Sequence, residues 1–238
     1  MTLEILQSRS QILAGRRELR RRGLSFATAP WRTWLTRFRL APRALRIGDQ
    51  LKSWDVLKTA EFIEARVPKD APLLDIGAFG SELPPVLHRL GYTRVSAIDL
   101  NPGIAAMPFA DAIDYRVGNF LRAPYADGSF AAVTSISVIE HGFDGATLAR
   151  ELQRVLRPGG YFIASFDYWP DKISTAGIRM FDMSWTIFSR DDVAQFLRVA
   201  AAHGLTPCGP LQFDAPSPAI FYAERRYTFA WLVLQRAG

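Results

Sequence analysis

A glycine-spaced turn between two short apolar runs constrains this chain more than any other feature. The first run, 72–76, leads into a turn with Gly77 and Gly80, and a second run, 95–98, ends in Asp99. In a doubly wound α/β sheet, a strand that feeds a glycine turn, with an acid at the tip of the next strand, holds an adenosine-bearing ligand. The glycines let the backbone approach the ligand closely, and the carboxylate can accept hydrogen bonds from both ribose hydroxyls.

The spacing of the glycines separates two kinds of adenosine ligand. A pyrophosphate cradle has the spacing Gly-x-Gly-x-x-Gly, whereas Gly77 and Gly80 form only Gly-x-x-Gly. The pattern therefore favours a nucleoside cofactor without phosphates over NAD.

Five segments occur at spacings of one βα unit: 73–80, 97–101, 115–120, 130–141 and 151–162. In this order they resemble the motifs of the class I S-adenosylmethionine-dependent methyltransferases, and the resemblance covers residues 50–238. It implies an α/β fold with a doubly wound, mostly parallel, seven-stranded Rossmann-like sheet and a terminal antiparallel pair. It also implies S-adenosylmethionine as cofactor.

Two departures from the family pattern lie next to the turn. Phe79 stands where the family has its middle glycine, and Ser81 replaces the last one. Pro84 and Pro85 follow, and because proline is tolerated in the first turn of a helix, we expect a helix to begin near Glu82. The prolines also remove N–H donors from that terminus, so we expect the methionine carboxylate to be held by other groups.

The resemblance implies cofactor-binding residues at the carboxyl ends of the first three strands: Asp75, Gly77, Gly80, Asp99, Asn119 and Phe120. In the family Asp99 would bind the ribose hydroxyls, and Asn119 would present its amide to adenine with Phe120 against the ring. Asp75 would anchor the loop and the methionine amino group. Simple turn-forming roles for Asp99 and Asn119, and a loop-bracing role for Asp75, remain alternatives.

Methyl transfer from a sulfonium depends mainly on positioning, and a general base is needed only if the acceptor must lose a proton. His141 follows the fourth strand, and its ordinary pKa near 6.5 suits proton abstraction. Asp167, after the fifth strand, is the rival base. A structural role for His141 stays open, and His88 and His203 are expected to be solvated and structural. We expect no metal, although an ion held by Glu140 and His141 is conceivable.

An aromatic insert interrupts the alternation of strands and helices over residues 167–189. Its aromatic residues are predicted to shape an acceptor pocket: Tyr168, Trp169, Phe181 and Trp185. The alternative is a small satellite core under a long loop. A small-molecule acceptor is expected, with a sugar or glycolipid precursor as one class that such rings would suit.

Helix and strand signals outside the motifs complete the predicted fold. Ser53 is a plausible N-cap, and Ser189 with Asp192 forms a capping-box pattern for a second helix. Strand candidates near 211–213 and over 227–234 would form the terminal antiparallel pair.

The positive charge of the chain is concentrated at its N-terminus. Residues 1–48 contain eleven arginines and no lysine against two acids, whereas the whole chain of 238 residues carries only +6. We predict a basic helical N-terminal extension over residues 1–50 and a methyltransferase domain over 51–238. Residues 1–22 are expected to form a helix that the domain does not need in order to fold. A basic segment of this kind suits an anionic membrane or a partner, and a merely solvated helix is the alternative.

Composition restricts the cellular setting and leaves two other functions to consider. The sequence contains no membrane-length apolar run and a single cysteine, Cys208, so a cytoplasmic location is expected and an internal disulfide is excluded. We do not expect a nucleic-acid partner, and the sequence does not fix the oligomeric state. The rival functions are a non-catalytic, methyltransferase-like binding or scaffold protein and an NAD-dependent oxidoreductase.

Overall fold

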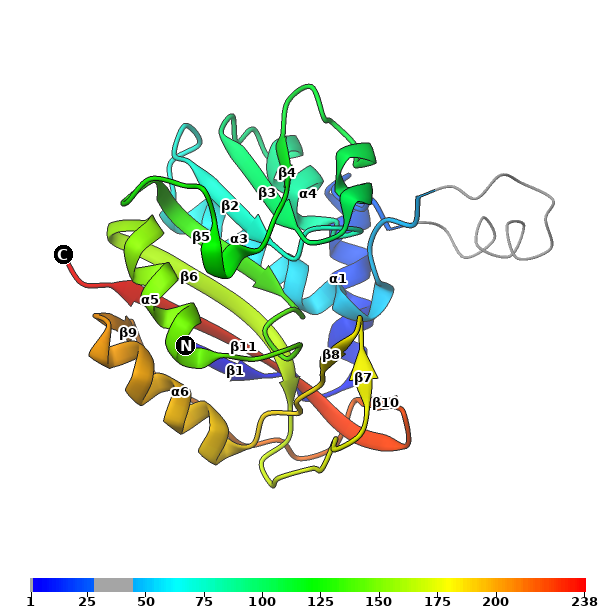
Figure 1. Ribbon diagram of the computed structural model, residues 1–238. Coiled ribbons are helices and arrows are strands. Elements are labelled where there is room, and N and C mark those ends of the chain that lie inside the picture. The colour runs from blue at the N-terminus through cyan, green and yellow to red at the C-terminus, as the bar shows by residue number, and fades with distance from the viewer. Residues whose placement is uncertain (1, 28–44) are drawn as a thin grey trace.

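The computed structural model describes residues 2–27 and 45–238 as a three-layer α/β domain, with helices on both faces of one sheet (Figure 1). The nine strands of that sheet lie in the order β1-β11-β6-β5-β2-β3-β4, with β9 and β10 also paired to β11. Their bounds are β1 (Leu3–Ile5), β2 (Leu73–Ile76), β3 (Val95–Asp99), β4 (Asp114–Val117), β5 (Phe130–Ile136), β6 (Leu156–Tyr168), β9 (Leu205–Pro207), β10 (Ile220–Tyr222) and β11 (Arg225–Arg236).

The five strands β4, β3, β2, β5 and β6 are parallel, and β11 runs antiparallel beside β6. Strands β2 and β5 are buried along almost their whole length, which is why they have continuous apolar runs in place of an alternating pattern. This topology confirms the predicted doubly wound sheet with an antiparallel strand at one end. It also places the carboxyl ends of all five parallel strands along one edge.

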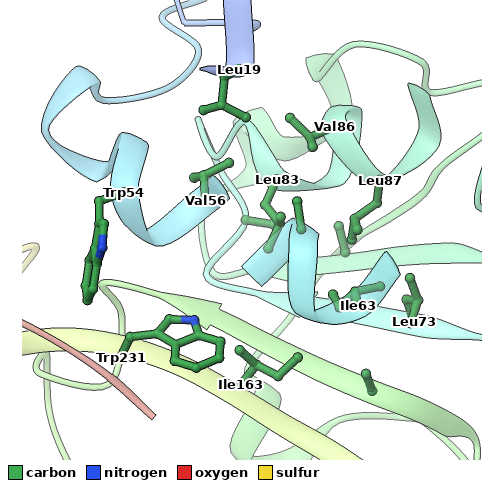
Figure 2. Packing of buried hydrophobic residues seen from close by; sticks show 14 of the residues in the cluster. Leu19, Trp54, Val56, Ile63, Leu73, Leu83, Val86, Leu87, Ile163 and Trp231 are labelled. Carbon is green, nitrogen blue, oxygen red and sulfur yellow. The ribbon is translucent and has the colours of Figure 1, made fainter. Parts of the chain in front are cut away.

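Helices α1 (Arg9–Arg21), α3 (Ser53–Arg66) and α4 (Leu83–Arg89) supply one core, and α5 (Gly145–Val155) and α6 (Arg190–Ala202) supply the other. Figure 2 shows side chains of α1, α3 and α4 gathered with side chains of β2, β6 and β11 in the first core. The predicted capping box opens α6, with Ser189 Oγ accepting from Asp192 N and the Asp192 carboxylate accepting from Ser189 N. The predicted helix with Pro84 and Pro85 in its first turn begins at Leu83.

The outer edge of β11 is covered by three short strands in succession. β10 pairs with residues 225–227, β1 with residues 230–232 and β9 with residues 234–236. The predicted antiparallel partner near residues 211–213 is therefore wrong in position, because β11 pairs with segments before and after it. Edge coverage of this kind removes the free backbone groups that would otherwise invite aggregation.

The first residues of the chain belong to the sheet and to its core. β1 precedes α1, and Leu3 and Leu6 have no exposed surface. Thr228 Oγ1 of β11 donates a 2.6 Å hydrogen bond to the carbonyl oxygen of Leu6. The expectation that residues 1–22 form only a helix, and one that the domain does not need, is therefore corrected. The domain boundary near residue 50 stays a prediction.

A buried ion pair fastens α1 to the start of α4. Arg16 Nη2 lies 2.5 Å from Glu82 Oε1, and Arg16 Nη1 lies 3.0 Å from Glu82 Oε2, with both side chains almost fully buried. Arg16 also donates to the hydroxyls of Ser25 and Ser53, and Glu82 accepts the backbone N–H of Phe26. Glu82 is the N-cap residue of α4, directly after the glycine turn. The pair therefore couples the N-terminal segment to that turn.

Removing the cation of this pair should destabilise the whole domain. Arg16→Met leaves the Glu82 carboxylate buried without its partner, and breaking a buried pair in this way costs about 3–5 kcal/mol. Urea denaturation followed by tryptophan fluorescence measures the change in the free energy of unfolding. Arg17→Met, one residue away on the exposed side of α1, is the control and should change it by less than about 0.5 kcal/mol. Equal effects of the two substitutions would mean that α1 is not fastened to the core through Arg16.

Candidate functional site

The carboxyl ends of the parallel strands open into a pocket of about 1140 Å³. Most of the residues that the sequence singled out as a site line this one pocket: Gly77, Gly80, Asp99, Asn119, Phe120, His141 and Asp167. Asp75 does not line it. The topology of the sheet therefore brings together the predicted cofactor and catalytic residues, apart from Asp75.

Gly77 and Gly80 occupy positions that other residues would not tolerate. Both have positive φ angles, +67° and +75°. A Cβ atom on Gly77 would lie 2.3 Å from the Val138 side chain, in the loop after β5. The turn after β2 can touch that loop only because residue 77 is glycine.

The N–H groups of the turn are largely bonded within the protein. Gly77 N donates to Ile98 O at 2.9 Å, and Ser81 N donates to Ala78 O at 3.0 Å. Phe79 N donates to Asp99 Oδ2 at 2.9 Å, and Gly80 N donates to Met107 Sδ at 3.3 Å. A pyrophosphate cradle needs such groups to point at the ligand. The turn is therefore suited to a close approach by a ligand and poorly suited to holding two phosphates.

Asp99 can still accept hydrogen bonds from a ligand in addition to those it accepts within the protein. Oδ2 accepts from Phe79 N, and Oδ1 accepts from Asn101 N at 2.7 Å. Each carboxylate oxygen can accept a second hydrogen bond, and the half-buried side chain lines the pocket. The turn-forming role and a ribose-binding role are thus compatible in one residue.

Asn119 and Phe120 begin a short 3₁₀ helix at the end of β4. Asn119 Oδ1 caps that helix by accepting from Leu121 N at 2.9 Å. This bond uses the carbonyl oxygen and leaves the amide NH₂ as the polar group that Asn119 can offer to a ligand in the pocket. Phe120 is buried and contributes an apolar wall.

Asp75 lies beneath the turn, where it braces two strands. It is 1% exposed, and Thr134 Oγ1 of β5 donates to its Oδ1 at 2.6 Å. Burial raises the pKa of Asp75 to about 7, against the lowering effect of the Thr134 bond. Its position supports the bracing alternative and gives no contact surface for the methionine amino group.

A strained residue marks the end of β5. Ser137 has a φ of +56°, which costs energy for a residue with a Cβ atom, and strain of this kind concentrates at functional sites. Its hydroxyl donates a 2.5 Å hydrogen bond to Glu140 Oε1. Glu140 has no exposed surface, and burial together with the neighbouring Asp167 raises its pKa to about 8.

His141 lines the pocket, but its environment differs from the prediction. Burial and the charge of Lys52 lower its pKa to about 4, and its Nδ1 is buried without a hydrogen-bond partner among the described residues. The ring packs edge-on against Phe181, with centroids 5.2 Å apart. His141 is therefore neutral at pH 7 and a weaker base than its ordinary pKa suggested.

Asp167 is the better placed of the two predicted bases. Its side chain is almost fully buried, and Trp185 Nε1 donates to its Oδ2 at 2.8 Å. Its other oxygen, Oδ1, lies 3.8 Å from Lys52 Nζ. Burial raises the pKa of Asp167, and the lysine charge partly opposes this. Nothing in the sequence pointed to Lys52, because it precedes the predicted helix at Ser53 and becomes a neighbour of Asp167 only in the folded chain.

The aromatic lining of the pocket comes mainly from residues that the sequence did not single out. Of the four predicted rings only Phe181 lines the pocket, in the turn between β7 (Arg179–Met180) and β8 (Met183–Ser184). Tyr168 belongs to the second core, and Trp185 donates a hydrogen bond to Asp167 without lining the pocket itself. The missed rings are Phe143, Phe221, Tyr222, Tyr227 and Phe229. The last four lie on β10 and β11. Sequence patterns marked β11 as a strand without indicating which face it turns to the pocket, and they did not mark β10.

The two remaining histidines do not line the pocket. In the described part of the chain there is also neither a candidate metal site nor a helix that could span a membrane. His88 packs against Phe109, and His203 ends α6. Over residues 2–27 and 45–238 there is no group of three histidine, cysteine, aspartate or glutamate residues placed to hold a metal ion. Within the same ranges no helix has the length and apolar character that crossing a membrane requires.

Known sequences match the part of the chain that builds the sheet and the turn. A family model described as a methyltransferase domain matches residues 74–164. A ubiquinone biosynthesis O-methyltransferase of Xanthomonas axonopodis pv. citri is 34% identical over 126 residues, which are 49% of this chain and 52% of that protein. The chain thus spans about half the length of the curated relatives that it matches.

Solved structures resemble a larger part of the chain. A geranyl diphosphate C-methyltransferase from Streptomyces coelicolor A3(2), solved with Mg²⁺, geranyl diphosphate and S-adenosyl-L-homocysteine, has a TM-score of 0.57 at 19% identity and is matched over 84% of this chain and 86% of that one. A [4+2]-cyclase has a TM-score of 0.59 at 14% identity, over 82% and 85%. At these identities the likeness establishes the fold alone.

The buried carboxyl groups predict a loss of stability as the pH rises above neutral. The folded protein holds the Glu140 proton up to about pH 8 and the Asp75 proton up to about pH 7, whereas the unfolded chain releases both near pH 4. The folded state therefore binds more protons in this range, and the free energy of unfolding falls as the pH rises through these values. Calorimetry of the ligand-free protein should show Tm decreasing from about pH 6.5 to about pH 9.

Glu140→Gln keeps the neutral form of that side chain and should reduce this decrease. Glu61→Gln, on the exposed face of α3, should leave it unchanged. The decrease in Tm is measured from about pH 6.5 upward because of His141. Below that pH its lowered pKa makes stability rise with pH and partly opposes the effect of the carboxyl groups. A Tm profile of Glu140→Gln that follows the parent profile would show that Glu140 does not hold a proton in the folded state.

Proposed function

We propose that this chain, which belongs to the class I S-adenosylmethionine-dependent methyltransferase family, binds S-adenosylmethionine in the pocket and transfers its methyl group to a small molecule. The observation that carries the proposal is the shared pocket. The glycine turn, Asp99 and Asn119 line it together with the predicted bases His141 and Asp167. A cofactor held by the first group would present its sulfonium toward the second.

The cofactor assignment follows from what each side chain can still bind. Asp99 has free lone pairs for the ribose hydroxyls, and Asn119 has an amide NH₂ for adenine. The apolar faces of Phe79 and Phe120 line the same pocket and suit the flat base. Gly77 and Gly80 allow the cofactor backbone to pass close to the turn.

The acceptor class is proposed from the lining of the rest of the pocket. A sugar or glycolipid precursor was one expectation, and the exposed rings of Phe221 and Tyr222 offer faces on which it could stack. The relatives are named for ubiquinone biosynthesis and for geranyl diphosphate, which favours an apolar or aryl acceptor instead. A mainly apolar lining that includes several aromatic rings agrees better with this second class.

Two other functions are less well supported. An NAD-dependent oxidoreductase would need N–H groups for a pyrophosphate, and the turn uses most of its own internally. A binding or scaffold role fits the Phe79 and proline departures, and the likeness to a [4+2]-cyclase shows that the fold is not restricted to one chemistry. The strained Ser137 and the buried carboxyl groups beside the pocket favour an enzyme over a scaffold.

For the basic N-terminal segment we propose contact with an anionic membrane or a partner. Some of its arginines pair internally, as Arg16 does with Glu82 and Arg22 with Glu64, so the described part offers fewer free cations than the sequence suggested. Contact with an anionic membrane or a partner remains our proposal for residues 1–48, of which 28–44 lie outside the described residues. A cytoplasmic location likewise stays a prediction.

Catalysis can be tested without knowing the acceptor. Incubation of the protein with S-adenosylmethionine labelled in its methyl group and a bacterial small-molecule extract, followed by mass spectrometry, should reveal a labelled product. Cofactor binding without any labelled product across such extracts would favour the scaffold alternative.

Asp99→Ala should weaken S-adenosylmethionine binding in a folded protein. Two charge-assisted hydrogen bonds to the ribose are lost, and bonds of this kind contribute about 1.5–3 kcal/mol each. Isothermal titration should therefore show a dissociation constant raised at least about tenfold. Asp111→Ala, an exposed acid outside the pocket, is the control. Parent-like affinity in Asp99→Ala would mean that Asp99 only shapes the turn.

A further inference from the structure

A donor and an acceptor face each other across a gap in the pocket. Lys52 Nζ and Asp167 Oδ1 are 3.8 Å apart, which is an ion pair but too long for a direct hydrogen bond. Both residues line the pocket. Asp167 is 5% exposed, and its Oδ1 is buried with no hydrogen-bond partner among the described residues. A buried carboxylate oxygen without a partner is costly unless something else binds it.

Both sides of the gap are held in place by other groups. Trp185 Nε1 fixes the other carboxylate oxygen of Asp167 at 2.8 Å. Lys52 Nζ lies 3.4 Å from the centroid of the Phe229 ring, and Asp49 caps the short 3₁₀ helix in which Lys52 sits. Such support keeps the gap open and its geometry fixed.

The chemistry of the gap selects one kind of ligand group. The lysine ammonium can only donate hydrogen bonds, and the ionised carboxylate can only accept them. A hydroxyl can do both at one atom. A neutral amine can as well, but it gives up its proton to a carboxylate far less readily than an aryl hydroxyl does. A carboxylate has no proton to donate to Asp167, and an ammonium ion has no lone pair for Lys52 and would be repelled by it.

We propose that this gap is the acceptor subsite and that the acceptor is an aryl alcohol, whose hydroxyl oxygen bridges Lys52 Nζ and Asp167 Oδ1 from the pocket side. The inference rests on the proposed methyltransferase function and names its substrate class. Tyr227 and Phe229 are almost fully buried beside the gap and close it with apolar surface, whereas Phe181, Phe221 and Tyr222 line the same pocket with exposed rings. These faces suit a flat aryl skeleton.

The reaction then follows from the two side chains. Asp167 takes the hydroxyl proton, and Lys52 stabilises the resulting oxygen anion. An oxygen lone pair forms a bond to the methyl carbon, and the carbon–sulfur bond breaks with its electron pair going to sulfur. The products are a methyl ether, S-adenosylhomocysteine and a protonated Asp167.

The neighbouring titratable groups agree with this assignment. Glu140 is buried and holds its proton to about pH 8, and Asp55 of α3 is buried with a pKa raised to about 6. His141 is neutral, and burial together with the nearby Asp167 raises the pKa of Tyr227 and keeps it neutral as well. Lys52 is then the cation, and Asp167 the base, that this cluster presents to the pocket.

The test compares matched aryl alcohols and aryl amines as acceptors. Catechol, 4-hydroxybenzoate and 2-naphthol are each paired with the amine of the same skeleton, and methyl transfer from labelled S-adenosylmethionine is followed by mass spectrometry. The proposal predicts that at least one alcohol is methylated, and that its kcat/KM exceeds that of the matching amine. Faster methylation of the amines, or no methylation of any alcohol by protein that binds the cofactor, would overturn it.

Substitutions at the gap locate the effect. Lys52→Met and Asp167→Asn should each reduce kcat/KM for the alcohol by roughly 10²–10⁴-fold, the usual contribution of a positioned acid or base, and leave cofactor affinity unchanged. Lys172→Met, an exposed lysine elsewhere, is the control. A loss of cofactor affinity in Lys52→Met would instead assign Lys52 to the methionine carboxylate and overturn the proposal. Absence of cofactor binding by the parent protein would overturn the proposed function itself.

Discussion

The approach of the turn after β2 to the loop after β5 is the contact on which the rest of the site depends. Residue 77 has no room for a Cβ atom, because that atom would lie 2.3 Å from Val138. Because the two segments touch, the glycine turn and the residues after β5 line one pocket. Gly77, Asp99 and Asn119 line the part of it that we propose holds the cofactor, and Ser137 and His141 line the same space. A methyl transfer needs this adjacency, since most of its catalysis is positioning.

Buried charge is the second organising feature, and it appears in two forms. The Arg16–Glu82 pair is fully satisfied, with partners for both side chains, and it ties the N-terminal segment to the start of α4. The carboxyl groups beside the pocket are only partly satisfied, and Asp167 Oδ1 has no partner among the described residues. The first arrangement stabilises the fold. The partly satisfied carboxyl groups destabilise the fold and can still accept hydrogen bonds from a ligand, which is common at functional sites.

The sequence predicted the sheet and the strand-end residues that line the pocket, because those features depend on local patterns. Apolar runs, glycine spacing and acids at strand ends are short-range signals, and they correctly placed Gly77, Asp99 and Asn119 in the pocket. The helix that has Pro84 and Pro85 in its first turn was predicted for the same reason.

What the sequence did not reveal depends on contacts between distant segments. The arginine-rich start of the chain looked like an extension, because no local pattern shows that Arg16 meets Glu82 or that Leu3 pairs with β11. Lys52 was missed, because no sequence pattern shows that the folded chain places it beside Asp167. The ordinary pKa of His141 was misleading, because burial and Lys52 lower it in the folded chain.

Isothermal titration of the parent protein with S-adenosylmethionine, S-adenosylhomocysteine and NAD most directly examines the nature of the pocket. We expect both sulfur-containing nucleosides to bind at one site per chain and NAD to show no binding. Saturable binding of NAD, with none of S-adenosylmethionine, would mean that the glycine turn holds a pyrophosphate after all and that the pocket does not serve methyl transfer.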